Sequence, residues 1–517
     1  MTRRILTLLL ALALVIGLAA CTPAAGTTAT TAGTTSKTAG TTAAAATTAK
    51  KLELTHPTLN IITVPAGAAF PDGVSIMKSE FFDLVVKKSG YQLNWQLFKT
   101  GEDTNAQINL LMASGNPPDL IQGASNSTIA GYARDGGLAA LDDALEQYGT
   151  YLKKFYPKEV LDYCRVNGKL YTLPRYLTNN GFAIGTLAVR KDWLTELGLT
   201  VPTTTDELYD VLKKVKAAKP NVIPLVVDGG FSRMFNILGA FGIPCDRSVN
   251  YIIENGKASF PYLDDRCVNF IKYMNKLYTE NLIDKEFLID KEAIQKMLSG
   301  NGFAMDINYV EIVRQMSAFQ TKNPTGVLEY IAPPKGPTGT SGHMGQGFIN
   351  PMWIVPKTSA GKVADCINFL NTCNADKELL DTFAFGIDGR DSKKNADGTV
   401  TKLDNFSKIS ATKGYYSRLD ITDNFDKGNN VLEGFTAPLN FLEKYKSVNE
   451  IRYAPLEVPA SANLLTEIRQ VVTDGILNMI IKGYSDEAFK AMKQAYVDKG
   501  GDKVLQEYQA WYATKAK

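Results

Sequence analysis

The sequence predicts an α/β protein in which two α/β units follow one another along a chain of 517 residues. Apolar, strand-like runs alternate with amphipathic helical runs over residues 59–121, and the same alternation resumes over residues 168–227. Strands that alternate with helices at this spacing favour parallel sheets. The residues after Lys50 are numerous enough to form two or three domains with hydrophobic cores of their own.

The first unit opens with the apolar run LNIITV, which Pro65 ends and which is predicted to be a strand. The segment EFFDLVVKKS has apolar residues at helical spacing and stops before Gly90, so it is predicted to be a helix. Trp95 lies in an alternating run that predicts a second strand. The predicted elements are strands over 59–64, 92–98 and 120–121, and helices over 80–89 and 104–113.

The second unit follows a turn at residues 168–173. The capping residues of PTTTDEL precede its longer helix, and Pro224 weakens the prediction of the strand that contains it. The predicted elements are strands over 182–189 and 222–227, a helix over 192–198 and a helix that ends near residue 219. Ligands of open α/β sheets bind outside the carboxyl ends of the strands, so we expect a ligand between the two sheets, in a cleft that hinge rotations open and close.

The N-terminal segment has the pattern of a secretory signal peptide. Arg3 and Arg4 precede an apolar run that is too short for a membrane span and ends in Leu-Ala-Ala-Cys. These four residues resemble the lipobox of bacterial lipoproteins, which implies a signal peptide over 1–20 and an acylated Cys21. The alternative is an ordinary cleavage site with an incidental cysteine. Residues 21–51, mostly Thr, Ala and Gly, are predicted to be a flexible linker.

Composition argues against several classes of function. The formal net charge is +3 and charges of both signs are interspersed, so we expect no nucleic-acid partner. No two cysteines have C-x-x-C spacing, and His56 and His343 are far apart in the sequence. This pattern supports neither a zinc site nor a thioredoxin motif, and a His-ligated metal site would have to use one of these two histidines. Cys245 and Cys267 are the candidate pair for a disulfide, and the alternative is that the cysteines are small buried apolar residues.

Two glycine-containing segments have weak similarity to ligand loops. The segment TGTSGHMGQG at 338–347 lacks the glycine order of a dinucleotide fingerprint and is predicted to be a connector. The segment DGRDSKKNADGT at 388–399 resembles a calcium loop only in part, because Lys393 would occupy the first ligand position. A hairpin tip is the preferred interpretation.

Five further stretches resemble the bacterial extracellular solute-binding proteins, family 1, of ABC importers, and in particular the large lipoprotein subgroup of Gram-positive bacteria. The stretches are ASGNPPDLI (113–121), NGKLYTLPR (167–175), VRKDWLTELGLTVPTTTDELYDVLKKVK (189–216), PMWIVPKTS (351–359) and FAFGIDGRD (383–391). They span most of the chain after the linker and occur in the expected order. The Arg-Lys-Asp-Trp-Leu block with Pro-Thr-Thr is the most specific of them.

This resemblance implies a two-lobe, periplasmic-binding-protein-like (type II) fold, no enzyme activity and no cofactor. It implies a monomer at the extracellular face of the cell membrane, attached only through its lipid, that passes its ligand to permease subunits. The implied lobes are residues 52–178 with 350–385, and residues 179–349 with 386–517. Hinge crossovers are expected over 176–181, 347–350 and 386–389, where glycine permits changes in the backbone dihedral angles.

Members of this family mostly bind carbohydrate, so we expect aromatic rings that stack on sugars and planar polar groups that pair with hydroxyls. The candidates at strand ends and crossovers are Ser125, Asn126, Arg175, Tyr176, Asn179, Asn180, Phe231, Arg233, Asp306, Tyr309 and Arg390. The alternatives are packing for Phe231 and Tyr309, inter-lobe salt bridges for Arg175 and Arg390, turn formation for Asn179 and Asn180, and core positions for Trp95, Trp193 and Trp353.

Two alternative functions stay open. The same fold could bind a peptide or another polar solute. A secreted carbohydrate-active enzyme would need two carboxylates that flank a cleft, and the sequence contains no motif for such a pair. Incubation with glycans separates these classes, because an enzyme yields products and a receptor leaves the glycan unchanged.

Overall fold

The computed structural model describes most of the chain after residue 50, and residues Lys50–Lys517 form one compact unit. The described residues are 51–65, 70–176, 185–231, 233–244, 251–289, 293–308, 319–342, 349–422, 456 and 464–515. Cys21 and the predicted linker up to Lys50 lie outside them. Within these described ranges, no helix is both long enough and apolar enough to span a membrane.

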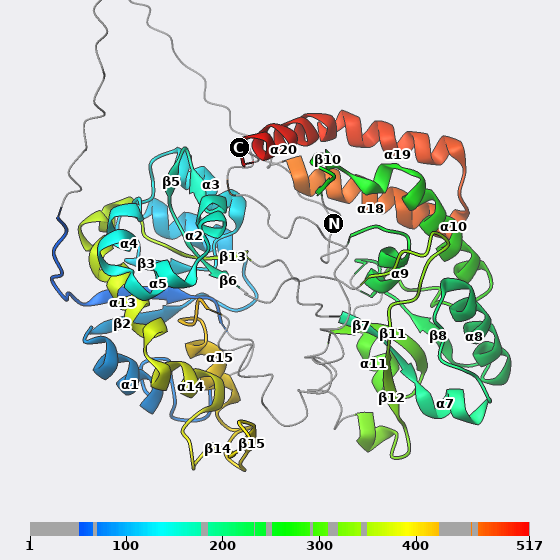
Figure 1. Cartoon of the computed structure of the whole chain (residues 1–517), viewed down its shortest axis with the longest axis horizontal. Helices are drawn as coiled ribbons and strands as arrows, with labels where there is room; N and C mark the ends of the chain where they lie inside the picture. The colour runs from blue at the N-terminus through cyan, green and yellow to red at the C-terminus, as the bar shows by residue number, and fades with distance from the viewer. Residues whose placement is uncertain are drawn as a thin grey trace, which may run out of the picture. The chain divides into compact units, whose positions relative to one another are not determined.

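A five-stranded mixed sheet forms the centre of what we call the first lobe (Figure 1). Its strand order is β2 (Leu93–Leu97), β1 (Leu59–Thr63), β3 (Leu120–Gln122), β13 (Ile349–Ile354) and β6 (Leu173–Tyr176). β1 is parallel to β2 and β3, whereas β13 is antiparallel to β3 and β6. The predicted parallel arrangement is therefore correct for the first three strands, and β13, for which the sequence predicts no strand, is antiparallel to its neighbours. That strand follows β12 of the other sheet, so no βαβ crossover enforces a parallel direction.

Local signals place the first helices where the sequence predicts them. The Ser79 side chain accepts a hydrogen bond from the Phe82 N–H, and Gly90 ends the helix with φ 75°. The helices of this lobe are α1 (Glu80–Ser89), α2 (Thr104–Ala113), α3 (Asn126–Arg134), α4 (Asp142–Tyr148), α5 (Thr150–Phe155), α6 (Lys158–Tyr163), α13 (Val363–Ala375), α14 (Lys377–Phe385) and α15 (Ser410–Tyr416). α13 packs against α1, α4 and α5, and a turn joins the short strands β4 (Arg165–Val166) and β5 (Lys169–Leu170).

The core of the first lobe confirms the interpretation of two tryptophans as core residues. Trp95 and Trp353 are each 1 % exposed. The Trp95 indole N–H donates to the Thr63 hydroxyl at 3.0 Å, and its ring meets Tyr416 edge-on. Both tryptophans belong to the same cluster as Leu59 of β1, so the sheet and its helices share one apolar core.

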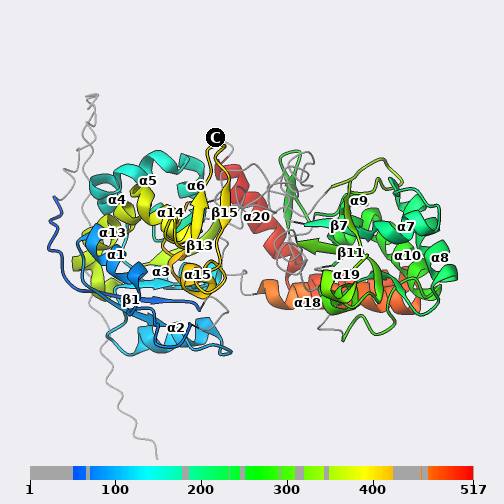
Figure 2. The ribbon, with the colours of Figure 1, turned by 90° about the horizontal axis from the view of Figure 1, so that it is seen from below.

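A four-stranded sheet forms the centre of the second lobe. Its order is β12 (Leu328–Ile331), β7 (Gly185–Arg190), β11 (Gly302–Asn308) and β8 (Ile223–Val226), with β11 parallel to β8 and β7 antiparallel to its two neighbours. Its helices are α7 (Lys191–Glu196), α8 (Thr205–Ala218), α9 (Phe235–Ala240), α10 (Asp265–Thr279), α11 (Ala293–Leu298), α18 (Leu465–Lys482), α19 (Asp486–Asp498) and α20 (Gly501–Lys515). α18 packs against α10 and α19 (Figure 2), and the hairpin β9 (Ile252–Glu254)–β10 (Lys257–Ser259) packs against α20.

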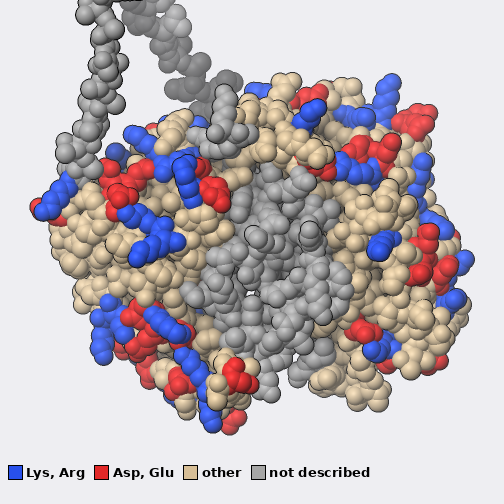
Figure 3. Space-filling view, in the orientation of Figure 1, with Lys and Arg blue, Asp and Glu red and all other residues tan. Residues whose placement is uncertain are grey.

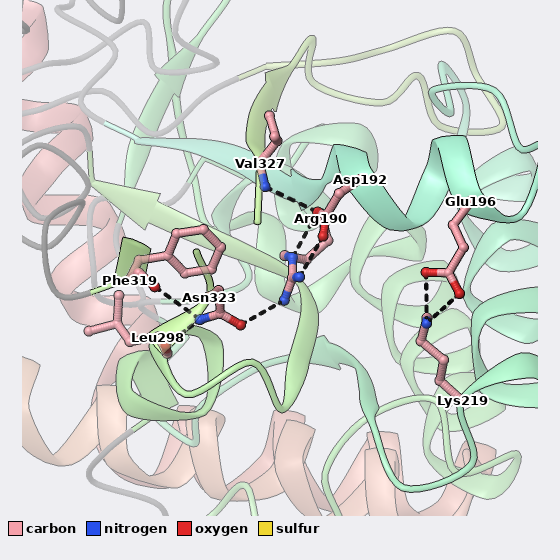
Figure 4. A network of polar contacts seen from close by, with 8 residues as sticks. All are labelled: Arg190, Asp192, Glu196, Lys219, Leu298, Phe319, Asn323 and Val327. Atoms are coloured by element: carbon pink, nitrogen blue, oxygen red, sulfur yellow. Dashed lines mark hydrogen bonds and ion pairs between the residues drawn. The ribbon is translucent and has the colours of Figure 1, made fainter. Parts of the chain in front are cut away.

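The Arg-Lys-Asp-Trp motif joins β7 to α7 through a local clamp (Figure 4). The Arg190 guanidinium donates two hydrogen bonds to Asp192, at 2.8 and 2.5 Å, and a third to the Asn323 side chain at 3.3 Å. It also lies 4.2 Å from the centre of the Trp193 ring. Asp192 in turn accepts from the Val327 N–H. The motif therefore has a structural role, and Trp193, 9 % exposed, is a core residue as the sequence analysis proposed.

The third crossover and the last lobe boundary differ from the prediction. Ala411, Tyr416 and Ile421 lie in the core of the first lobe, although residues 386–517 were assigned to the second. Leu456 belongs to the same core, and Ile468 is the first residue of α18 in the core of the second lobe. Residues 411–421 and Leu456 therefore pack in the first lobe, and α18 packs in the second. Residues 386–389 form the turn that ends α14. Gly386 has φ 78°, and its N–H donates to the carbonyl of Thr382.

Two minor interpretations are also resolved. The segment at 388–399 is a hairpin tip, as preferred, because β14 (Ser392–Lys394) pairs with β15 (Val400–Lys402) and Gly398 turns the chain at φ 84°. The proposed disulfide is wrong, since Cys267 is a free, buried cysteine. Burial in the core of the second lobe raises the pKa of its thiol far above the usual range, which keeps the sulfur unreactive.

Candidate functional site

The strands β1, β3 and β6 of the first sheet have their carboxyl ends at the same edge of the sheet. β1 and β3 are parallel, and β13 is antiparallel to both β3 and β6, so β6 runs in the same direction as β1 and β3. In open α/β sheets this edge is where ligands bind. We call it the first-sheet edge. Polar residues at this edge include Ser125, Asn126, Arg175, Tyr176 and Arg418.

Ser125 and Asn126 lie where the chain passes from β3 into α3. The Ser125 hydroxyl caps the helix by accepting from the Thr128 N–H at 3.2 Å, and it also contacts the Thr128 hydroxyl at 2.8 Å. The Ser125 N–H donates to the Asn105 side chain at 2.9 Å. Ser125 and Asn126 are both half-buried, so each stays partly accessible at the sheet edge although Ser125 caps the helix.

Arg175 and Tyr176 end β6, and a returning segment runs beside them. The Tyr176 N–H donates to the Ile421 carbonyl at 3.1 Å, and the Tyr176 ring meets Phe155 edge-on at 5.7 Å. The same segment carries Arg418, whose Nη2 donates to the carbonyl of Pro65, just after β1, at 3.4 Å. Arg418 therefore reaches the first-sheet edge, although it is not among the residues predicted from the sequence.

A second group lies at the carboxyl end of β8 and β11 in the other lobe. Arg233 Nη1 donates to the Asp306 carbonyl at 3.3 Å, so the structure brings these two predicted residues together. The Asp306 carboxylate is fully buried and accepts from the Asn236 N–H at 2.8 Å and from the Asn236 side chain at 2.6 Å. Burial raises the pKa of Asp306 to about 7, against the opposing effect of the Asn236 hydrogen bonds.

The burial and hydrogen bonds of three residues do not fit the ligand contacts that the sequence predicts for them. These residues are Asp306, Phe231 and Arg390. Asp306 has no exposed surface and positions the first turn of α9 rather than a ligand. Phe231 is 1 % exposed and meets Phe270 edge-on in the core, which agrees with its packing alternative. Arg390 forms two hydrogen bonds to Asp391, both at 2.8 Å, and a third to Glu80 of α1. It is a salt-bridge residue, but the bridge lies within the first lobe and not between the lobes.

Asn179, Asn180 and Tyr309 lie outside the described residues, and so does His343 of the glycine-rich segment. Their proposed roles stay predictions. Among the residues that the structure does describe, no group of three or more His, Cys, Asp or Glu side chains is arranged to hold a metal ion.

A separate cavity of about 360 Å³ lies in the first lobe, away from the first-sheet edge. Pro117 and Tyr132 line it together with Pro356, which follows β13. Since β13 is antiparallel to β3, the end of β13 and the start of β3 lie at the opposite edge of the sheet. The surface in Figure 3 carries basic and acidic side chains interspersed, as the sequence composition suggests.

Arg418 is the residue that sequence reasoning missed. Its segment, YYSRLD, contains no strand-like or helical signal that relates it to β6 more than 240 positions earlier. The contact exists because Tyr415 and Tyr416 anchor α15 in the core of the first lobe. The only local hint is the pair of adjacent aromatic residues, which favours burial of that segment.

Comparison with known proteins identifies the family. The model of the bacterial extracellular solute-binding proteins matches residues 80–372, which is more than half of the chain. The polygalacturonan/rhamnogalacturonan-binding protein YtcQ of Bacillus subtilis is 26 % identical over 427 residues, which cover 78 % of this chain and 82 % of that protein. The fructooligosaccharide ABC transporter substrate-binding protein FusA of Streptococcus pneumoniae is 28 % identical over 304 residues, which cover 53 % of this chain and 54 % of that one.

Solved structures show the same fold. FusA in complex with kestose superposes with a TM-score of 0.68 and 19 % identity, covering 89 % of this chain and 99 % of that one. The alginate-binding protein AlgQ2 superposes with a TM-score of 0.69 at 19 % identity, covering 89 % of this chain and 98 % of that chain. The fold is thus the two-lobe, periplasmic-binding-protein-like (type II) fold, and the chain belongs to the bacterial extracellular solute-binding protein family.

Proposed function

We propose that this chain is the substrate-binding receptor of an ABC importer. It captures a carbohydrate, in particular an oligosaccharide, and delivers it to permease subunits. The observation that carries the proposal is the family match over residues 80–372, which include strands of both sheets. The names of YtcQ and FusA, both saccharide-binding proteins, support carbohydrate as the ligand class. A receptor of this kind, working as a monomer, binds and releases without bond chemistry.

The carboxyl edges of the two sheets supply suitable chemistry for such a ligand. Half-buried Ser125, Asn126 and Tyr176 offer hydroxyl, amide and aromatic groups. Sugars need this combination, because their C–H faces pack on rings while their hydroxyls exchange hydrogen bonds with planar polar groups. Arg233 offers a guanidinium at the corresponding edge of the second sheet.

We expect a thermal-shift assay to show ligand binding. The protein from Lys51 onward contains the compact unit apart from Lys50 and is screened against monosaccharides, oligosaccharides and peptides. An oligosaccharide should raise the melting temperature in a dose-dependent way, by an amount equivalent to about 2.7 kcal/mol at a hundredfold excess over Kd. Chromatography of the incubated glycan should show no products.

Each other outcome contradicts a stated part of the proposal. Shortened glycans in the chromatogram would establish the enzyme alternative. A shift with peptides alone would establish a receptor for another polar solute. If no saccharide or peptide raises the melting temperature, the proposal that this chain captures a carbohydrate is contradicted.

The proposal also includes a lipid anchor on Cys21 that holds the receptor at the cell membrane. The LipO lipoprotein of Bacillus subtilis, 26 % identical over 331 residues that cover 59 % of this chain and 62 % of that protein, supports an anchored relative. Two acyl chains hold a protein stably at a bilayer without a spanning helix. We expect the full chain to fractionate with membranes and to incorporate labelled palmitate, and the Cys21→Ala variant to lose both properties. Equal membrane retention of the two proteins would contradict the anchor.

A further inference from the structure

Four arginines of the described region are paired with carboxylates. Arg165 pairs with Asp142, Arg190 with Asp192, Arg266 with Glu254 and Asp264, and Arg390 with Glu80 and Asp391. Arg418 has no carboxylate partner among the residues that the structure describes, and its one hydrogen bond to protein, at 3.4 Å, goes to the Pro65 carbonyl. Its Nε is buried and has no hydrogen-bond acceptor within the described part of the chain. A guanidinium offers five N–H donors, so most of the hydrogen-bonding capacity of Arg418 is unused.

A second positive charge lies close to Arg418. Arg175 ends β6, beside the segment that carries Arg418, and the Tyr176–Ile421 hydrogen bond fixes that arrangement. Burial, and next the positive charge of Arg175, lower the pKa of Arg418. Arg175 has further contacts of its own and contributes here as a neighbouring charge. An arginine stays charged inside a protein, so this arrangement carries an electrostatic cost unless an anion offsets it.

The neighbouring acid does not supply that anion. Asp420 lies two residues after Arg418 and is 2 % exposed. Its Oδ1 accepts from the N–H of Thr422 at 2.9 Å and from the Thr422 hydroxyl at 2.6 Å. Asp420 is not among the charges that act on Arg418, whose electrostatic neighbours are Arg175 and Tyr415.

We propose that Arg418, with Arg175 beside it, binds a carboxylate of the ligand, so that the saccharide this protein captures contains an acidic sugar, a uronate. The planar fork of a guanidinium matches a carboxylate with two parallel hydrogen bonds, and both arginines lie at the first-sheet edge, where ligands of this sheet type bind. A neutral sugar would leave the positive charge of Arg418 without an anion to offset it. This inference rests on the proposed carbohydrate-binding function and specifies the class of saccharide.

Calorimetric titration of the protein from Lys51 onward tests the inference. The probes are a galacturonate tetramer, an alginate tetramer and the carboxyl-reduced, neutral form of each. At least one acidic tetramer should bind about tenfold to hundredfold more tightly than its reduced form, because a hydrogen-bonded charge pair is lost on reduction. The Arg418→Gln variant should lose this preference, and Arg418→Lys should retain only part of it. Arg390→Gln, in the same lobe, is the matched control and should keep the preference.

Thermal unfolding without ligand provides a second readout. Because Arg418→Gln removes a charge that has no anionic partner, the unliganded variant should melt at the same or a higher temperature than the parent. A lower melting temperature together with unchanged preference for the acidic tetramer would make Arg418 structural and overturn the inference. Equal affinity for acidic and neutral tetramers would also overturn it, while leaving the proposed receptor function intact. Absence of binding to every saccharide would instead overturn the proposed function.

Discussion

Replacement of Asp119 by alanine is expected to lower the free energy of unfolding by about 3 kcal/mol or more. Asp119, just before β3, is 4 % exposed and accepts hydrogen bonds from the N–H of Asn60 at 2.9 Å, the Ser359 hydroxyl at 2.7 Å and Lys362 Nζ at 2.9 Å. It therefore links β1, β3 and the turn after β13. The alanine variant removes the acceptor of the buried Ser359 hydroxyl, of the half-buried Asn60 N–H and of the half-buried Lys362 ammonium. Urea unfolding followed by circular dichroism measures the loss.

The double variant Asp119→Ala/Lys362→Met is the matched control, because it removes the ammonium that the first change leaves without a partner. It should recover part of the lost stability. A single variant within 1 kcal/mol of the parent would contradict the assigned role. Burial opposes ionisation of Asp119, but the hydrogen bonds from Asn60, Lys362 and Ser359 outweigh it and lower its pKa below 3.8. Its contribution is therefore present above pH 3.8 and is lost as the pH falls through the lowered folded-state pKa.

Asp306 is expected to have the opposite pH dependence. Burial raises its pKa from 3.8 to about 7, so between these values the folded chain holds a proton that the unfolded chain releases. The free energy of unfolding should therefore fall as the pH rises through this window, by about 1.4 kcal/mol per pH unit and a few kcal/mol in total. The Asp306→Asn variant cannot titrate and should lack this slope. Its amide oxygen can still accept from the N–H of Asn236.

Unfolding curves of the parent and of Asp306→Asn at intervals from pH 4 to pH 8 measure this difference. Asp306→Ala is the control for the hydrogen bonds alone, because it removes both the titration and the acceptors of Asn236. It should be less stable than Asp306→Asn at every pH. Parallel curves for the parent and Asp306→Asn across the window would contradict the raised pKa.

Local signals were sufficient for most elements. The helices predicted over 80–89 and 104–113 have these bounds in the structure, because Ser79 and Asp103 cap their N-termini. The strand predicted around Pro224 is present as β8, and Pro224 is buried in it. A capping side chain and a helical or alternating apolar pattern act within a few residues, so the sequence alone contains the information.

The candidate site was only partly predictable. The position of four residues at the first-sheet edge was predictable, because each follows or ends a recognisable strand, and the carboxyl ends of parallel strands meet at one edge. These residues are Ser125, Asn126, Arg175 and Tyr176, and their contact with a ligand stays a prediction. Phe231 also follows a strand, yet its side chain turns into the core. The direction of a single side chain after a strand depends on neighbours that are distant in sequence, here Phe270 of α10.

The sequence by itself determined the two α/β units, the bounds of the helices at 80–89 and 104–113, and the family, since these depend on residues close together along the chain or on motifs in a given order. Only the tertiary structure decided that β13 runs antiparallel, that residues 411–421 pack in the first lobe, that Asp306 is enclosed and that Arg418 lies beside β6. Each of these depends on contacts between segments 70 to 353 positions apart, which are set by where apolar surface is buried and not by local conformational preference.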